Sequence, residues 1–291
     1  MRTSVLAAAV SVVVLAGGAF GDAIWDYEAV DSLGYGTHPL VGAMPDDANK
    51  VTIEGLVIGG TEDFVNRNAA FAMYSIWVQD DTTTKGGIQC WTGPWAKDGG
   101  WDAYPVIYGG ARVRVSGWLA NNAGKVFIND RHSAALLWTV DVLDCTVGMP
   151  APQVIPSISA CNYFDQTRSG GGELYQTRWV ELNGVEIVSG TWGAGQPLTI
   201  SDGTGTLTML LSQMGDFNSY SAPTGTFNVL GVFDQEDTNN DGDFQDMYRL
   251  WVKDFADITA VPEPGTIALV GLALAGGWLF RRRLARKGGA R

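Results

Sequence analysis

Between the two ends of the chain, apolar and polar residues alternate over short segments that are separated by turns rich in Gly, Asn and Asp. The period is two residues, and β-branched and aromatic side chains are enriched, which is the pattern of half-buried β-strands. The predicted strands cover residues 51–58, 75–80, 87–91, 111–119, 125–129, 180–187, 198–205, 206–211, 227–233 and 248–253. We find no long amphipathic helical pattern among them, so the body of the protein is predicted to be all-β.

The strand pattern repeats. Gly55 and Gly184 occupy the same offset in the first strand of each set, and Asp80 and Asp202 end the second strand. Each set has five strands with a longer, partly helical connection between the third and the fourth, which is the OB-fold order. The pattern resembles extracytoplasmic OB-fold modules of bacterial exported proteins, although the first set has Asp-Asp-Thr where the second has Asp-Gly-Thr-Gly. The resemblance implies two tandem OB-fold-like five-stranded barrels; a single β-sandwich or jelly roll is the alternative.

The last 31 residues have three parts. A short Val261-Pro262-Glu263-Pro264 segment comes first. The uncharged, apolar run Ile267–Phe280 follows it, and a cluster of Arg and Lys begins at Arg281. Proline cannot continue a helix or a central strand, so the first part is predicted to be extended and exposed. As a helix, the apolar run falls just short of a hydrocarbon core of about 30 Å, and the basic end suits the cytoplasmic side of a membrane.

This arrangement resembles the PEP-CTERM sorting signal of bacterial exported proteins. The resemblance implies that the tail is recognised and cleaved by an exosortase-type membrane protease, with Val261, Pro262, Glu263 and Pro264 as the sorting motif. A transmembrane helix would hold the protein at the membrane until then. The alternative is an ordinary C-terminal membrane anchor.

The N-terminus reads as a secretory signal peptide. A short basic start, an apolar stretch from Val5 to Ala16 and small residues up to Gly21 predict cleavage after Gly21 or Ala23. The expected organisation is a signal peptide (1–21), a first OB-like domain (22–137), a connector (138–172), a second OB-like domain (173–260) and the sorting signal (261–291). The body would face an extracytoplasmic space.

The charge of the chain limits its partners. The net charge is −12, and seven of the 19 basic residues lie in the two terminal segments, whereas Glu263 is the one acidic residue there. The body is therefore more acidic than the whole chain and should repel phosphate backbones, so no nucleic-acid partner is expected. The sequence also has no Gly-x-Ser-x-Gly, His-Glu-x-x-His or phosphate-binding Gly motif and contains two His residues, so it is not expected to be an enzyme.

Residues 237–246 resemble the start of an EF-hand or dockerin calcium loop, with oxygen-bearing side chains at alternate positions and Gly242 sixth. The expected ligands are Asp237, Asn239, Asp241, Asp243 through its carbonyl, and Asp246, with Asp234 as another source of the missing carboxylate. Tyr248 takes the twelfth position, where that family has Glu, and no helices flank the loop. The prediction is a weak structural Ca²⁺ site, in the millimolar to sub-millimolar range; a hydrated hairpin loop is the alternative.

Tryptophans are frequent in the first predicted domain. Trp77 and Trp91 fall in predicted strands and are expected to pack in the core, whereas Trp95 and Trp101 lie in the Gly-rich segment 93–101. Aromatic side chains on an OB barrel can stack against sugars or bases. Trp95 and Trp101 are therefore candidate ligand-binding residues for a neutral glycan such as an extracellular polysaccharide.

The chain has three cysteines, and export would place them in an oxidising compartment. Cys145 and Cys161 flank a Pro-rich connector, so this pair is preferred for a disulfide over a pair with Cys90. The spacings do not suit a zinc site.

Together these features predict a non-catalytic exported protein at the cell surface or in the extracellular matrix, with a structural, adhesive or binding body. The first alternative is a carbohydrate-binding module that uses its Trp-rich loops. The second is an accessory domain related to nucleic-acid-binding OB modules.

Overall fold

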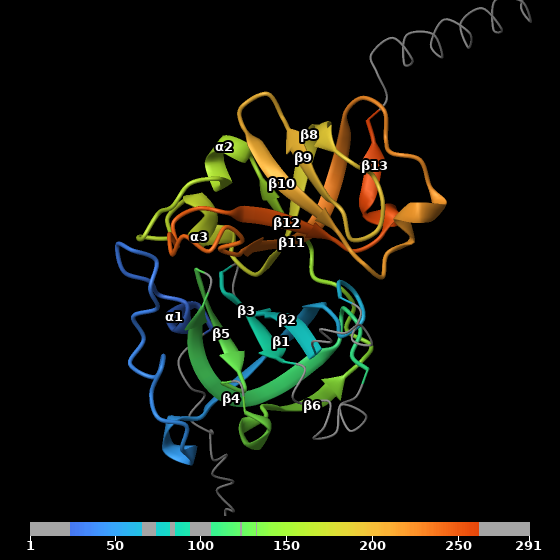
Figure 1. Ribbon diagram of the computed structural model, residues 1–291. Coiled ribbons are helices and arrows are strands. Elements are labelled where there is room, and N and C mark those ends of the chain that lie inside the picture. The colour runs from blue at the N-terminus through green and yellow to red at the C-terminus, as the bar shows by residue number, and fades with distance from the viewer. Residues whose placement is uncertain are drawn as a thin grey trace, which may run out of the picture.

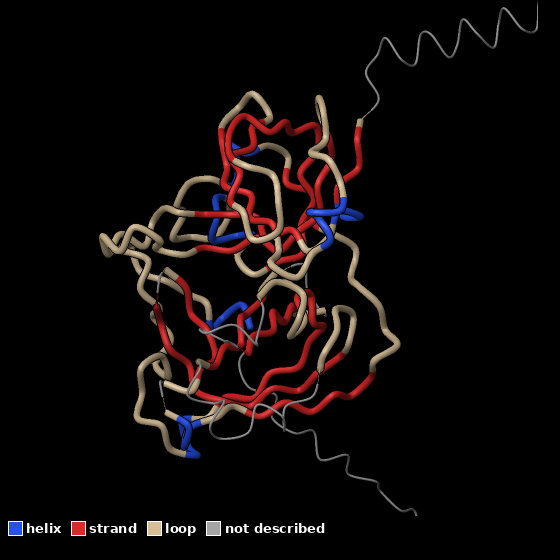
Figure 2. Tube along the Cα trace, turned by 45° about the vertical axis from the view of Figure 1, so that its right-hand side comes forward, coloured by secondary structure: helices blue, strands red, loops and turns tan. Residues whose placement is uncertain are grey.

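The computed structural model describes residues 24–65, 74–81, 85–93, 106–122, 124–131 and 133–261. Two β-barrels lie one above the other, and the N-terminal segment runs beside both (Figure 1; Figure 2). The predicted signal peptide, Trp95, Trp101, the residues from Pro262 to Pro264 and the apolar C-terminal run lie outside the described residues.

The first barrel is closed. Its strands follow the order β1-β2-β3-β5-β4, and β4 pairs with β1 to complete the barrel. The pair β3–β5 is parallel, and the other pairs are antiparallel. A sixth strand, β6, pairs with the first half of β4, at Arg112–Ser116. The strands are β1 (Val51–Gly59), β2 (Tyr74–Gln79), β3 (Gly87–Thr92), β4 (Arg112–Asn122), β5 (Lys125–Asn129) and β6 (Thr139–Asp144).

The second barrel repeats this topology. Its order is β8-β9-β10-β12-β11, the pair β11–β8 closes it, and β10–β12 is the parallel pair. Two short strands extend the sheet, with β7 beside β8 and β13 beside β11. The strands are β7 (Gln153–Ile155), β8 (Arg178–Gly190), β9 (Pro197–Ser201), β10 (Thr206–Leu211), β11 (Phe227–Gln235), β12 (Tyr248–Val252) and β13 (Ile258–Ala260).

The predicted fold class, two tandem OB-fold-like five-stranded barrels, is confirmed, and the alternative of a single sandwich is wrong. The structure adds β6, β7 and β13, which the sequence analysis did not predict. β6 is exposed along nearly its whole length, and β7 and β13 have three residues each, so none shows a clear apolar alternation. The segment 138–172, predicted as a connector, contains β6 of the first sheet and β7 of the second.

The helices are short and lie in connections. Among the described residues they are α1 (Ile24–Tyr27), α2 (Ile158–Cys161), α3 (Gly171–Tyr175) and the 3₁₀ turns η1 (Asp47–Asn49), η4 (Ala134–Leu136), η5 (Asp216–Ser219) and η6 (Phe255–Asp257). In the part of the chain that the structure describes, no helix is both long and apolar enough to cross a membrane.

Each barrel is filled by its own apolar core. Tyr74, Val115 and Trp138 are among the buried residues of the first core, and Phe217, Phe227 and Leu250 are among those of the second. Where core side chains come from strands, as Val113 and Val115 of β4 do, they occupy alternate positions, as expected when one face of a strand points into a barrel. Trp138 and Phe217 lie outside the strands, Phe217 in η5.

All three cysteines are free thiols, so the predicted Cys145–Cys161 disulfide is not present. Cys161 is buried in the second core, where its Sγ donates to the Ile158 carbonyl at 3.4 Å. Cys145 lies exposed, just after β6 at the edge of the first sheet. Burial raises the pKa of Cys161 to about 12 and also raises that of Cys90, so both thiols are held in their unreactive form.

Candidate functional site at the barrel junction

A third apolar core joins the two barrels. Phe64 is fully buried, and its ring centroid lies 5.0 Å from that of Trp77 in the first barrel and 5.5 Å from that of Trp251 in the second. The buried members of this shared core are Ile58, Phe64, Val65, Trp77, Trp179, Val232 and Trp251. Because neither barrel can bury these side chains alone, the junction behaves as part of the fold.

The two backbones also meet directly. The carbonyl of Phe64 accepts from the N–H of Gln213 at 3.0 Å, and the Gln79 Oε1 accepts from the N–H of Trp179 at 2.9 Å. A Cβ atom on Gly87 would lie 1.8 Å from the Thr177 carbonyl oxygen, so this contact requires glycine. Such approaches leave no room for a hinge at this point of the junction.

A buried ion cluster spans the junction beside the shared core. The Asp234 carboxylate of β11 is fully buried and accepts from the Lys125 Nζ of β5 at 2.6 Å. It also accepts from Arg249 at 2.8 Å and from the Trp251 Nε1 at 3.0 Å, both on β12. Glu236, which is partly exposed, takes a second bond from Arg249 at 2.6 Å. These hydrogen bonds and ion pairs offset the cost of removing the Asp234 carboxylate from water.

The electrostatics of Asp234 follow from these contacts. Burial alone would raise the pKa of its carboxyl, but the Lys125 ammonium and the Arg249 guanidinium outweigh burial and lower that pKa to about 2. Asp234 is therefore ionised throughout the neutral range and holds Lys125 of one barrel against Arg249 of the other.

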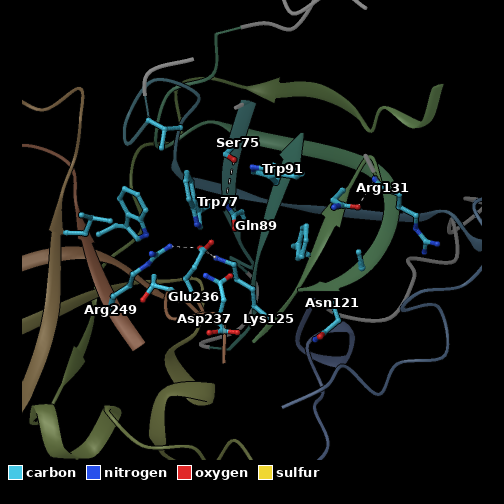
Figure 3. A pocket seen from close by; sticks show the side chains of 18 of the residues that line it. Ser75, Trp77, Gln89, Trp91, Asn121, Lys125, Arg131, Glu236, Asp237 and Arg249 are labelled. Atoms are coloured by element: carbon cyan, nitrogen blue, oxygen red, sulfur yellow. Dashed lines mark hydrogen bonds and ion pairs between the residues drawn. The ribbon is translucent and has the colours of Figure 1, made fainter. Parts of the chain in front are cut away.

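A cavity of about 740 Å³ opens beside the ion cluster. One wall is the outer face of the first barrel, where Trp77 on β2 and Gln89 and Trp91 on β3 point the same way (Figure 3). The other wall comes from the second barrel, with Glu236, Asp237 and Arg249 labelled in the same view. The volume lies within the range of about 300–1,000 Å³ that is usual for ligand pockets.

Four aromatic rings line the cavity: Trp77, Trp91, Phe127 and Trp251. Trp91 is only partly buried, and its ring and that of Phe127 form a T-shaped pair with a centroid distance of 6.4 Å and an interplanar angle of 85°. Polar side chains lie between the rings. The Gln89 Nε2 donates to the Ser75 Oγ at 3.4 Å, and the Asn129 Oδ1 accepts from the N–H of Arg131 at 2.7 Å.

The predicted ligand-binding residues Trp95 and Trp101 lie outside the described residues, so the structure does not place them. Trp77 is buried, as expected, but in the shared core and not in the barrel interior. Trp91 faces the cavity, contrary to the expectation that it packs in the core. The signal was in the sequence: Gln89 and Trp91 share one face of β3, opposite to the face of Ile88 and Cys90 that fills the barrel.

The predicted calcium loop joins β11 to β12. Its carboxylates accept backbone N–H groups within the loop, as when Asp237 bonds Gly242 at 3.1 Å and Asp241 bonds Asp243 at 2.9 Å. Asp246 has a raised pKa, first through partial burial and then through the charges of Asp243 and Asp241. No group of three or more His, Cys, Asp or Glu side chains converges as a metal site in the described ranges. Asp234 is part of the ion cluster and does not join the loop.

The N-terminal segment packs against this loop. The Gln245 Nε2 donates to the Ser32 carbonyl at 3.0 Å, and the Tyr35 and Phe244 rings meet edge to face at 5.0 Å. Asp237, Thr238 and Asn240 of the loop also line the cavity, so the loop forms part of its rim.

Comparison with known proteins identifies one sequence feature. Residues 260–283 match the PEP-CTERM protein-sorting motif. This motif implies an exported protein that is anchored at the membrane and then sorted through exosortase, a membrane protein. No curated protein matches the chain in sequence.

Among solved structures, the similarity is weak. One solved structure, described as "Structural mimicry for functional antagonism", is 11% identical to this chain, with a TM-score of 0.30. The match covers 69% of this chain and 90% of the other. A replication protein A heterotrimer bound to single-stranded DNA is 13% identical, with a TM-score of 0.30 and coverages of 78% and 53%. A murine DNA-binding protein bound to double-stranded DNA is 12% identical, with a TM-score of 0.29 and coverages of 73% and 97%. Similarities at this level carry no argument about function.

Proposed function

We propose that this chain is a non-catalytic exported protein whose two-barrel body acts as a structural or adhesive module at the cell surface or in the extracellular matrix. The observation that carries the proposal is the PEP-CTERM motif at 260–283, which begins where β13 ends. On this proposal the signal peptide at 1–21 starts export. The apolar run Ile267–Phe280 holds the body at the membrane until exosortase releases it.

The packing of the body supports a structural role. The barrels share a buried core, and the buried charges Lys125 and Arg249 both bind Asp234. Charges that are fully engaged with each other serve docking better than proton transfer to a substrate, because a general acid or base must reach the reacting group.

Removal of the sorting tail tests the proposal. Mass spectrometry of the mature protein from surface and extracellular fractions is expected to show a C-terminus near Pro264, without the Arg-rich end. A variant with Pro262→Ala, Glu263→Ala and Pro264→Ala is expected to stay in the membrane fraction with its tail intact. A surface-exposed wild-type protein that retains Arg281–Arg283 would instead indicate a plain anchor.

Carbohydrate binding is the second candidate. It was predicted from Trp95 and Trp101, and the half-buried Trp91, four residues before Trp95, gives it separate support because its indole lines a cavity. Loss of polysaccharide binding in Trp95→Ala and Trp101→Ala variants would support the loop site.

We also propose that the loop at 237–246 binds Ca²⁺ weakly, with Asp237, Asn239, Asp241, Asp243 and Asp246 as ligands. Its support is the bond from the Gly242 N–H to Asp237 and the charge repulsion among the acidic side chains, which a cation would relieve. The loop would have to close around the ion, which suits an affinity near the millimolar end of extracellular sites.

Calcium is therefore expected to stabilise the protein modestly. With a Kd of about 1 mM, about 10 mM CaCl₂ adds about 1.4 kcal/mol to the free energy of unfolding, or about 3–6 °C in Tm for a body of this size. The measurement is thermal melting in CaCl₂ against EDTA, with Asp241→Asn as the matched variant and NaCl at equal ionic strength as the control. Equal melting temperatures in all conditions would remove Ca²⁺ from the proposal.

A further inference from the structure

We propose that the cavity between the barrels is a binding site for a neutral saccharide, with Trp91 as the stacking surface and buried N–H groups of Trp77, Asn121 and Arg131 as donors to its oxygens. The site is defined by described residues and does not rely on Trp95 or Trp101, which the structure does not place. The inference goes beyond the structural role proposed above and does not depend on how the chain is sorted.

The first argument is the shape of the site. The cavity lies where two folded barrels meet, a preferred position for ligand pockets. Strands β2, β3 and β5 form one wall, and β12 together with the loop that carries Asp237 forms the other. Its floor is held by the bonds of Asp234 to Lys125 and Arg249, so the walls are already in place without a ligand. A preformed site loses little conformational entropy when it binds.

The second argument is the aromatic surface. Trp91 is partly exposed and lines the cavity (Figure 3). Phe127 also lines the cavity and meets Trp91 edge to face. The face of an indole ring carries negative charge density and its edge carries positive charge density. The C–H groups on one side of a pyranose ring carry weak positive charge, so a sugar ring matches an indole face.

The third argument is a set of donors without acceptors. Among the described residues, the Trp77 Nε1, the Asn121 Nδ2 and the Arg131 Nε are buried and have no hydrogen-bond partner, and all three residues line the cavity. Trp77 is only 2% exposed. Buried polar groups normally have partners, so these positions indicate a ligand or ordered water that supplies oxygen atoms.

One buried acceptor in the cavity also has no hydrogen-bond partner. The Asp237 Oδ1 is also buried without a partner and belongs to the opposite wall. A hydroxyl group donates one hydrogen bond and accepts others, so a polyhydroxylated ligand can satisfy both the donors and the acceptor. A simple anion can satisfy only the donors.

The charges of the lining favour a neutral ligand. Lys125 and Arg249 are paired with Asp234 and Glu236, and Asp237 adds a further negative charge opposite Arg131. The site therefore has no excess of positive charge, and the chain as a whole carries a net charge of −12. Phosphate backbones and polyuronates would be repelled at long range.

Binding is tested with the full chain, purified in detergent, and a defined set of probes. The neutral probes are hexasaccharides of β-1,4-linked glucose, mannose, xylose and N-acetylglucosamine; the charged probes are hexagalacturonate and single-stranded (dT)₂₀. We expect calorimetric titration to detect at least one neutral hexasaccharide with a Kd below about 1 mM, and neither charged probe.

Variants locate the site. Trp91→Ala should weaken binding by about tenfold or more, Trp91→Phe should retain part of it, and Asn121→Ala should weaken it by a few-fold. Tyr220→Ala, which removes an exposed aromatic ring outside the cavity, should bind as the wild type does. Asn121→Ala is the decisive variant if Trp91→Ala does not fold, because its Nδ2 has no bond to lose.

Three outcomes would overturn the inference. One is that no neutral probe binds up to about 10 mM; another is that only a charged probe binds. The third is that binding survives Trp91→Ala and Asn121→Ala and is lost in Trp95→Ala or Trp101→Ala, which would assign it to the loop. Because tail removal is read separately by mass spectrometry, none of these outcomes affects the sorting proposal.

Discussion

Replacing Asp234 with alanine is expected to lower the free energy of unfolding by about 3–5 kcal/mol, because it removes the fully buried carboxylate that both buried cations bond. The Lys125 side chain is 5% exposed and that of Arg249 11%, so neither can turn to water without opening the junction. The Trp251 Nε1 loses its acceptor as well. Urea unfolding at pH 7 measures the loss.

A matched variant separates the effect of burial from that of charge. Glu236 bonds the same two cations, but its side chain is 41% exposed. Glu236→Ala is therefore expected to cost less than about 1 kcal/mol, as for other solvent-screened ion pairs. Equal losses in the two variants, or a loss below about 1 kcal/mol for Asp234→Ala, would contradict the view that the buried cluster holds the barrels together.

The ionisation of Asp234 makes the stability loss of the Asp234→Ala variant depend on pH. The folded-state pKa of Asp234 is about 2, below its ordinary value of 3.8. A group whose pKa is lowered by folding contributes stability that is present above its unfolded-state pKa and is lost as the pH falls through its folded-state pKa. The difference in unfolding free energy between the wild type and Asp234→Ala is therefore expected to be constant above about pH 5 and to shrink between about pH 4 and pH 2.

The barrels could be predicted because each strand has one face in a core. In β10, Leu207, Met209 and Leu211 are buried and alternate with more exposed residues, and the predicted bounds 206–211 are those observed. β5 was likewise predicted over 125–129. β6 escaped prediction because it adds to the outer edge of β4 and buries little, so no core selects its side chains.

The junction could not be predicted in the same way. All five residues of β5 are buried. Val126 and Ile128 lie in the core of the first barrel, whereas Lys125, Phe127 and Asn129 line the cavity at the junction, so alternation no longer distinguishes inside from outside. The bond between Lys125 and Asp234 joins residues 109 positions apart. Nothing local in the sequence indicates that a lysine in one repeat meets an aspartate in the other.

The disulfide prediction was wrong for a related reason. Proximity in sequence across the Pro-rich connector favoured Cys145 with Cys161. In the structure that connector takes the chain from the edge of the first sheet to the second barrel, where Cys161 is buried in the core. The sequence distance between two residues does not measure the spatial distance when the segment between them crosses from one domain to another.

Replacing Phe64 with alanine is expected to lower the free energy of unfolding by about 3–5 kcal/mol and to separate the unfolding of the two barrels. Phe64 is fully buried between Trp77 and Trp251, one from each barrel, so its removal leaves a cavity in the core that joins them. The wild type, with this core intact, is expected to unfold in a single transition. Scanning calorimetry of the variant should show two transitions, because the barrels then retain separate cores without a well-packed junction.

Phe217→Ala is the matched control, because Phe217 is also fully buried but belongs to the core of the second barrel alone. The same side-chain atoms are removed, so a similar loss of about 3–5 kcal/mol is expected. The junction stays intact, so the second barrel still unfolds together with the first and one transition remains. Two transitions in both variants would mean that any weakening of a barrel uncouples it. One transition in both would mean that the ion cluster and the backbone contacts at Gly87 are enough to hold the barrels together without the shared core.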